Sequence, residues 1–81
     1  GLHQVTIRAD AATKLTVVNA LNMVGFAKSK GDARRLVQGG GARVNDNVVT
    51  VEKENIDLTD FKDGKVKISA GKKRHALIVI E

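Results

Sequence analysis

Residues 26–46, FAKSKGDARRLVQGGGARVND, decide the fold because they contain a helix start, a helix stop and the beginning of a strand. Ser29–Asp32 matches a capping box, in which the Ser29 hydroxyl accepts from the Asp32 amide and the Asp32 carboxylate accepts from the Ser29 amide. The predicted helix buries one stripe, formed by Ala33, Leu36 and Val37. Three glycines, Gly39–Gly41, end it, because glycine adopts positive φ without a Cβ clash.

The same stretch is strongly basic. Within residues 28–43, Asp32 stands against five cations: Lys28, Lys30, Arg34, Arg35 and Arg43. A second basic block without acids covers residues 65–74 and contains Lys65, Lys67, Lys72, Lys73 and Arg74. Residues 44–63, between the blocks, hold Lys53 and Lys62 against six acids: Asp46, Glu52, Glu54, Asp57, Asp60 and Asp63. One charged run is equally compatible with a solvated face, but this alternation favours a face that contacts a partner.

Another helix is predicted ahead of this stretch, from Leu15 onward. Its apolar face has helical spacing and consists of Val17, Ala20, Leu21 and Val24. Thr16 or Thr13 can cap its start, and Gly25 suits the left-handed position that ends a helix. Residues 1–13 are weakly patterned, and the alternation around Val5 and Ile7 predicts a short edge strand or an ordered arm.

Two hairpins are predicted downstream. The first pairs Ala42–Asn45 with Val48–Val51 through an Asp46-Asn47 turn. Residues 52–64 follow as an irregular acidic loop, which we expect Leu58 and Phe61 to pin to the core.

The second hairpin opens at Asp63-Gly64 and covers about residues 65–80. Its first strand alternates between a buried face (Val66, Ile68, Ala70) and a second face (Lys65, Lys67, Ser69). Gly71–Lys73 is the expected turn. His75–Ile80 is nearly all apolar, as expected of a strand covered on both sides.

The composition fits one domain with a polyanionic partner. The chain has 81 residues, 42% of them hydrophobic, no cysteine and a net charge of +5. These values exclude disulfides and thiolate metal sites, and a basic balance suggests nucleic acid or, less often, an anionic membrane. No apolar run approaches the length of a membrane span, so we expect no membrane partner. The chain begins with Gly1 rather than Met, so we expect a piece of a longer protein.

The sequence contains no catalytic or cofactor-binding constellation. His3 and His75 are isolated, so they form no metal site, and packing or surface exposure explains His75 better than an RNA contact. The glycine clusters lack the Lys-Ser/Thr pair of a nucleotide-binding loop. Capping accounts for Ser29 better than nucleophilic chemistry does, because no base is placed beside it. We therefore expect no cofactor and no metal in this domain.

The basic stretch has the features of a phosphate-binding site. The start of a helix offers free amides and a positive dipole end, here beside Lys28 and Lys30. Arg34 and Arg35 project from its first turns and can grip phosphate or stack on a base. The only aromatic residues are two phenylalanines, and single-strand binders usually need stacking platforms. A structured RNA, read through its backbone and shape, is therefore favoured.

The order of these features resembles the S-four-type RNA-binding domain, named for a small-subunit ribosomal protein. That family has a helix ending in Gly, a loop with Ser, a helix with Ala-Arg-x-Leu, a Gly, and a strand ending in Val-Asn. Matching residues here span about 15–51 and are Gly25, Ser29, Ala33-Arg34, Leu36-Val37, Gly39–Gly41 and Val44-Asn45. The resemblance implies an α+β fold in which two N-terminal helices, an αL-type RNA-binding motif, pack on a small, mostly antiparallel sheet. Gly31 inside the second helix departs from the pattern.

The tail narrows the resemblance to one branch of this family. Leu58–Phe61, Asp63–Val66 and Gly71–Leu77 are similar to the C-terminal domain of bacterial tyrosyl-tRNA synthetases. This implies that residues 1–81 form a single RNA-binding domain that grips tRNA(Tyr), joined to the rest of a cytoplasmic synthetase chain, with a homodimeric parent. ATP binding and ligase activity would belong to the parent alone, because the nucleotide-binding and activation motifs are absent here.

The resemblance and the charge pattern together predict the residues that contact RNA. They are Lys28, Ser29, Lys30, Arg34, Arg35, Gln38, Arg43, Asn45, Lys72, Lys73 and Arg74. We expect one surface formed by Lys28, Lys30, Arg34, Arg35 and Arg43, because the glycine stop lets the Arg43 strand lie alongside the helix. Lys72, Lys73 and Arg74 would extend its edge. Two alternatives stay open. One is an S-four-type module of another ribosome- or rRNA-associated protein, against which the tail argues. The other is an interaction module for an acidic protein.

Overall fold

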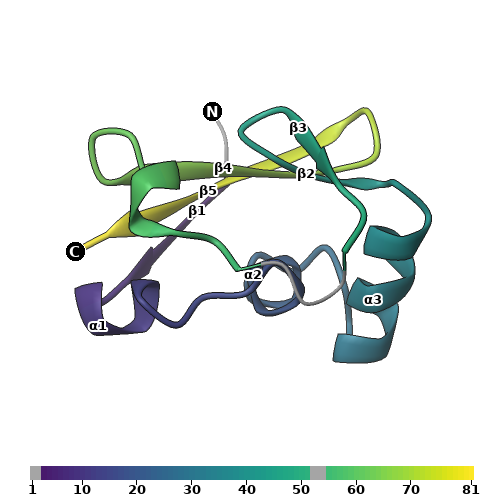
Figure 1. The fold of residues 1–81 in the computed structure, drawn as a ribbon, viewed down its shortest axis with the longest axis horizontal. Helices are drawn as coiled ribbons and strands as arrows, with labels where there is room; N and C mark the ends of the chain where they lie inside the picture. Colours follow the sequence, from purple (N-terminus) through teal and green to yellow (C-terminus); the bar gives the residue numbers. More distant parts are fainter. Residues whose placement is uncertain (1–2, 52–54) are drawn as a thin grey trace.

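A computed structural model describes residues 3–51 and 55–81 and shows helices packed beneath one face of a sheet (Figure 1). Its elements in chain order are β1 (His3–Ile7), α1 (Ala9–Ala12), α2 (Val17–Met23), α3 (Lys30–Gln38), β2 (Ala42–Val44), β3 (Asn47–Val49), the 3-10 helix η1 (Leu58–Asp60), β4 (Lys65–Ala70) and β5 (Arg74–Ile80). The predicted α+β class with a mostly antiparallel sheet is confirmed.

The sheet has the strand order β1-β5-β4-β2-β3. β1 pairs with β5 in parallel, while the β5–β4, β4–β2 and β2–β3 pairs are antiparallel. The prediction of an edge strand around Val5 and Ile7 is therefore correct. Its partner is the last strand of the chain, with Val5 opposite Ile78, and this distant pairing left no signal in the local pattern.

A short helix, α1, lies between β1 and α2 and was not predicted. It has four residues, of which Ala12 is fully buried, and Arg8 precedes it without a side-chain cap. A single turn cannot display the repeated apolar spacing by which helices are recognised. Thr13 ends it, and the Thr13 hydroxyl donates to the Asp10 carbonyl at 2.7 Å.

Helix α2 supplies the centre of the core. Thr16 is its N-cap, and its hydroxyl accepts from the Asn19 amide at 3.1 Å. At the other end Gly25 has φ of +84°, and the Gly25 and Phe26 amides donate back to the Asn22 and Leu21 carbonyls. These paired bonds form a Schellman motif, which turns the chain toward α3.

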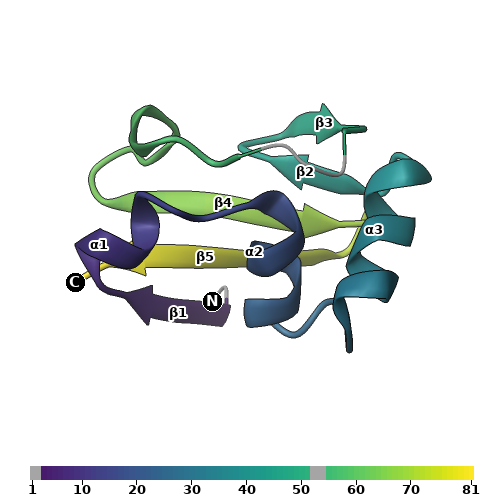
Figure 2. The same cartoon turned by 60° about the horizontal axis from the view of Figure 1, so that its bottom comes forward.

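The core lies between the helices and the lower face of the sheet. Its largest fully buried side chains include Leu21 from α2, Ile68 from β4 and Ile78 from β5. The expectation that His75–Ile80 is covered on both faces is wrong. Helices lie on one face only, and Leu77 and Val79, which point to the other, are half-buried (Figure 2). β5 lies between β1 and β4 in the sheet. Side chains of these two strands, and not a second layer, partly cover its apolar residues on the open face.

The turn of the first hairpin lies one residue earlier than predicted. Asn45 and Asp46, with φ of +50° and +71°, connect β2 to β3, whereas the sequence suggested Asp46-Asn47. Positive φ at both central positions is the signature of a type I′ turn. The pairing of Val44 with Asn47 follows and keeps Val44 on the buried face.

The segment before β4 packs on the core partly through other residues than predicted. Ile56, 2% exposed, packs in the core, and its amide donates to the Leu15 carbonyl at 2.9 Å. Leu58, which we expected to pin the loop, is 51% exposed. Phe61 does pack against the core. Ile56 stands alone in a polar run, so its neighbours gave no periodic signal for burial.

Candidate nucleic-acid interface

One of the two hydrogen bonds predicted for the capping box at the start of α3 is present. The Ser29 hydroxyl accepts from the Asp32 amide at 3.1 Å. The Asp32 carboxylate, expected to return to the Ser29 amide, instead has Oδ1 3.5 Å from Nη1 of Arg35. The helix therefore begins at Lys30, with the exposed Lys28 and Lys30 on either side of the cap.

Arg34 and Arg35 point away from the core. Their neighbours Ala33 and Val37 are fully buried, so the helix has one inner stripe and an outer basic face. The Arg35 side chain is 78% exposed, and its pairing with Asp32 is a surface ion pair of the kind that contributes little to stability. A phosphate can replace that carboxylate at small cost. Gln38, in the last turn of α3, is also exposed.

The glycine stop closes α3 with a second Schellman motif. Gly40 takes φ of +74°, and the Gly40 and Gly41 amides donate to the Val37 and Leu36 carbonyls at 3.1 and 2.9 Å. The stop sends the chain directly into β2.

We predict that Gly31→Ala stabilises the domain. A Cβ at Gly31 would lie 3.7 Å from Ser29 Oγ and 3.8 Å from Arg35 Nη2, which is ordinary contact, and alanine favours helix by roughly 0.5–1 kcal/mol. The melting temperature should rise by a few degrees, because 1 kcal/mol corresponds to about 4–8 °C in a small domain. Gly40→Ala is the matched control and should lower it, because its positive φ disfavours alanine. A lower melting temperature for Gly31→Ala would contradict this account.

The turn between β4 and β5 lies at the same end of the sheet as α3 (Figure 2). The Gly71 amide donates to the Gly41 carbonyl at 2.8 Å, which joins this turn to the glycine stop. Arg74 donates from Nη1 to the Phe26 carbonyl at 3.3 Å, and its guanidinium lies 5.4 Å from the centre of the Phe26 ring. The structure therefore brings the end of the second basic block, with the exposed Lys72 and Lys73, beside the loop that leads into α3.

His75 and Ser69 brace this turn, a role that sequence reasoning missed. His75 Nε2 lies 3.2 Å from the Lys72 carbonyl oxygen, and Nδ1 lies 2.8 Å from Ser69 Oγ. Because a carbonyl only accepts, Nε2 donates, and in the neutral ring Nδ1 then accepts from the Ser69 hydroxyl. Ser69 is 1% exposed, although its place on the basic side of β4 suggested exposure. The alternation of residues predicted the correct sheet face for Ser69, but it could not predict that neighbouring side chains bury it on that face.

Arg43 and Asn45 are placed differently from the other predicted RNA contacts. Arg43 lies between the buried Ala42 and Val44, so its side chain points to the sheet face opposite the helices. The structure therefore does not set it on the outer face of α3. The Asn45 amide Nδ2 donates to the Asp60 carbonyl at 2.7 Å, and its Oδ1 accepts from the Lys67 amide at 3.0 Å. These bonds give Asn45 a role within the protein.

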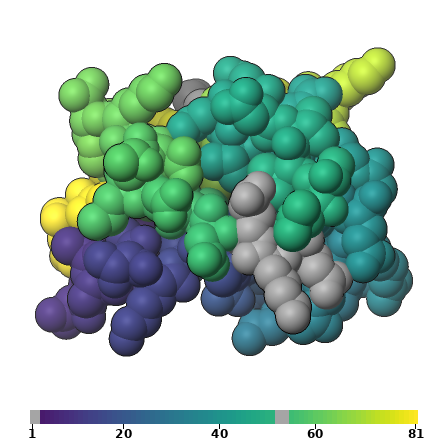
Figure 3. All heavy atoms as spheres, in the orientation of Figure 1, coloured from purple at the N-terminus to yellow at the C-terminus, as the bar shows by residue number. Residues whose placement is uncertain are grey.

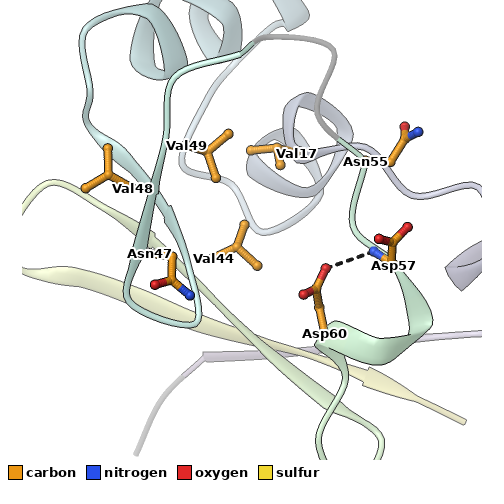
Figure 4. A pocket seen from close by; sticks show the side chains of 8 residues that line it. All are labelled: Val17, Val44, Asn47, Val48, Val49, Asn55, Asp57 and Asp60. Atoms are coloured by element: carbon orange, nitrogen blue, oxygen red, sulfur yellow. Dashed lines mark hydrogen bonds between the residues drawn. The ribbon is translucent and has the colours of Figure 1, made fainter.

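Two acidic residues, Asp57 and Asp60, line a hollow whose described walls contain no residue of α3. Of the acidic block, Glu52, Lys53 and Glu54 lie outside the described residues. Asp57 and Asp60 cap η1, and the Asp57 amide donates to Asp60 Oδ2 at 2.9 Å (Figure 4). They line a cavity of about 260 Å³ whose other described walls include Val17, Val44 and Val49. Carboxylates on its rim make this hollow unsuited to phosphate, so the basic end is the candidate RNA site.

Neither a metal-binding cluster nor a membrane-spanning helix is found in the part of the chain that the structure describes. Residues 3–51 and 55–81 contain no group of three or more His, Cys, Asp or Glu side chains that could hold a metal ion. Within the same residues, no helix has the length and apolar character needed to cross a membrane.

Comparison with known proteins gives the same family as the sequence motifs. The family model of the S4 domain, the S-four-type module, matches residues 16–61. A tyrosine–tRNA ligase from Wolbachia sp. subsp. Drosophila simulans is 43% identical over 91% of this chain, which covers 18% of that enzyme. A tyrosine–tRNA ligase from Gluconobacter oxydans is 46% identical over 83% of this chain, 16% of that enzyme. One from Rhodospirillum rubrum is 43% identical over 94% of this chain.

These matches confirm the resemblance to bacterial tyrosyl-tRNA synthetases. The chain spans less than a fifth of the length of these relatives. The likeness therefore concerns one domain-sized part of each enzyme.

Proposed function

Because the chain belongs to the S4 domain family, we propose that it is the RNA-binding domain of a tyrosine–tRNA ligase and holds structured RNA, tRNA(Tyr), at the α3 end of its sheet. The observation that carries this proposal is that three separate segments present cations at that end. They are the loop with Lys28, the outer face of α3 with Arg34 and Arg35, and the turn with Lys72 and Lys73.

The mechanism is electrostatic capture followed by positioning. Amides at the start of α3 and the helix dipole attract a phosphate, and Lys28 and Lys30 add charge beside it. Arg34 and Arg35 can each form paired hydrogen bonds to phosphate oxygens. Arg74 and His75 hold the 71–73 turn in place through the Phe26 and Lys72 carbonyls, so its lysines are positioned before RNA arrives.

Ligase activity, ATP binding and dimer formation are proposed to belong to the rest of a cytoplasmic parent protein. The domain then contributes affinity for tRNA and brings it to a catalytic domain elsewhere in the chain. Its own residues provide no catalytic constellation, so we expect no tyrosine activation by this chain alone.

Titration of the chain with a tRNA(Tyr) transcript tests the proposal. We expect saturable binding whose log K falls with log salt by roughly 0.7–0.9 per phosphate contact, so that about five contacts give a slope near −4. A ribosomal RNA fragment of matched length and polyglutamate serve as comparisons. Equal or tighter binding of polyglutamate would support an acidic protein partner instead, and preference for the ribosomal fragment would support a ribosome-associated module.

A further inference from the structure

The face of the sheet opposite the helices carries a row of cations. Residues pointing to this open face alternate with buried ones along each strand. The register sets Arg43 opposite Ser69, Lys67 opposite Leu77 and Lys65 opposite Val79. Each of the three cations adjoins a buried core residue along its strand, such as Val44, Val66 or Ile68. Its own side chain therefore points to the open face.

The three cations are close enough to act together. Lys65 and Lys67 are two residues apart on one strand, which is about 7 Å. Arg43 lies diagonally across from Lys67 on the neighbouring strand, also about 7–8 Å away. We name Arg43, Lys65 and Lys67 the open-face track. In the described strands no acid occupies an open-face position.

Asp46, in the β2–β3 turn, is an acidic neighbour of the track and interacts with its charge. The Lys67 ammonium donates to Asp46 Oδ1 at 3.0 Å and holds the pKa of that carboxyl below its usual range. The charge of Arg43 lowers the same pKa further. Asp46 therefore neutralises only part of the track, and Lys65 stays exposed.

The track continues into the α3 surface around the end of the sheet. The 71–73 turn lies between them, joined to the glycine stop by the Gly71–Gly41 hydrogen bond and to β5 by the His75–Lys72 hydrogen bond. In Figure 3 this turn, coloured yellow-green, projects at the same side of the molecule as α3. Lys72 and Lys73 thus bridge the two basic surfaces.

We propose that the open-face track is a second binding surface for a ribose-phosphate backbone, so that one RNA contacts the α3 end and the open face together. This inference rests on the proposed function and extends it. Backbone contacts need cations but no deep pocket. A protein partner would instead be anchored by aromatic side chains or fitted pockets. Beside the track, Leu77 and Val79 are half-buried and Val48 is exposed, whereas the two aromatic residues of the chain, Phe26 and Phe61, pack against the core.

Charge removal on the track tests the proposal. The variant R43Q/K65Q/K67Q removes the three charges and keeps polar, unbranched side chains, and R8Q/K14Q removes exposed charges around α1, at the other end of the molecule (Figure 3). We expect the track variant to bind tRNA(Tyr) at least about 10-fold more weakly, with a salt slope smaller by about 2, from 0.7–0.9 per lost contact. The control should lose little. If the triple variant melts early, Lys65→Glu alone, at an exposed site, gives the decisive measurement.

The outcomes separate this inference from the proposed function. Unchanged affinity and slope in the track variant, while changes at Arg34 and Arg35 weaken binding, would overturn the second surface and leave the first. Unchanged tRNA binding in both variants would overturn the proposed function itself. Loss of polyglutamate binding with tRNA binding intact would show that the track meets an acidic protein, which also overturns the inference.

Discussion

Replacing Arg34 and Arg35 together with alanine is expected to weaken tRNA(Tyr) binding on the order of 10- to 100-fold. Each guanidinium lost removes hydrogen bonds to charged oxygens, and one such bond contributes about 1.5–3 kcal/mol net of the bonds exchanged with water, while about 1.4 kcal/mol corresponds to tenfold in affinity. Two fewer phosphate contacts should also reduce the salt slope by about 1.4–1.8. Affinity measured at several salt concentrations gives both values. The effect should be large because both arginines lie on the outer face of α3, beside the capped helix start.

The same variant should fold normally. Arg35 takes part in one described ion pair, with Asp32, and that pair is exposed. Thermal denaturation should therefore show nearly the wild-type melting temperature, and R8A/K14A supplies a charge-matched control that keeps its affinity. A folded Arg34/Arg35 variant with wild-type affinity and salt slope would remove α3 from the interface.

The second large effect is expected from Leu21→Ala. Leu21 is 0% exposed at the centre of α2, and removing a fully buried leucine side chain costs about 2–5 kcal/mol through lost burial and the cavity left behind. In a domain of this size that is a large part of the total stability, because whole domains unfold at roughly 5–15 kcal/mol. The melting temperature should fall by at least about 10 °C, and chemical denaturation gives the free energy directly.

Met23→Ala, on the same helix, is the matched comparison. Met23 is 38% exposed, so its truncation should cost much less than that of Leu21. RNA affinity of the Leu21 variant, measured where the protein is still folded, should stay near wild type because the side chain is fully buried and cannot contact RNA itself. Equal destabilisation by the two substitutions would mean that the core is centred elsewhere.

Local signals in the sequence predicted the helices and their ends. Ser29, Gly25 and Gly40 act through bonds to residues at most five positions away, so their roles could be predicted from spacing alone. Turn chemistry was less decisive, because Asn45-Asp46 and Asp46-Asn47 are equally suited to a type I′ turn. The choice is made by Asn45, which bonds to Asp60 and Lys67, and by the need to keep Val44 buried.

The sequence predicted one basic surface formed by Lys28, Lys30, Arg34, Arg35 and Arg43, and the structure sets Arg43 on the sheet face opposite the helices instead. Charge blocks identified the cations of α3 and of the 71–74 segment, and the structure adds that Arg74 reaches Phe26 across the fold. Strand alternation could have indicated that Arg43 shares a face with Lys65 and Lys67, but only after the register of β2 against β4 was known. That register depends on contacts between residues far apart in sequence, which no local pattern contains.

The parallel pairing of β1 with β5 has a consequence for synthesis of the protein. Residues 3–7 find their partners only at 76–80, and the Glu81 amide donates to the Ile7 carbonyl at 2.8 Å. During synthesis on the ribosome this edge of the sheet therefore cannot form until β5 has left the exit tunnel. Closing such a long loop slows folding of the nascent chain. Until then β1 remains an unpaired strand, open to association with other nascent chains.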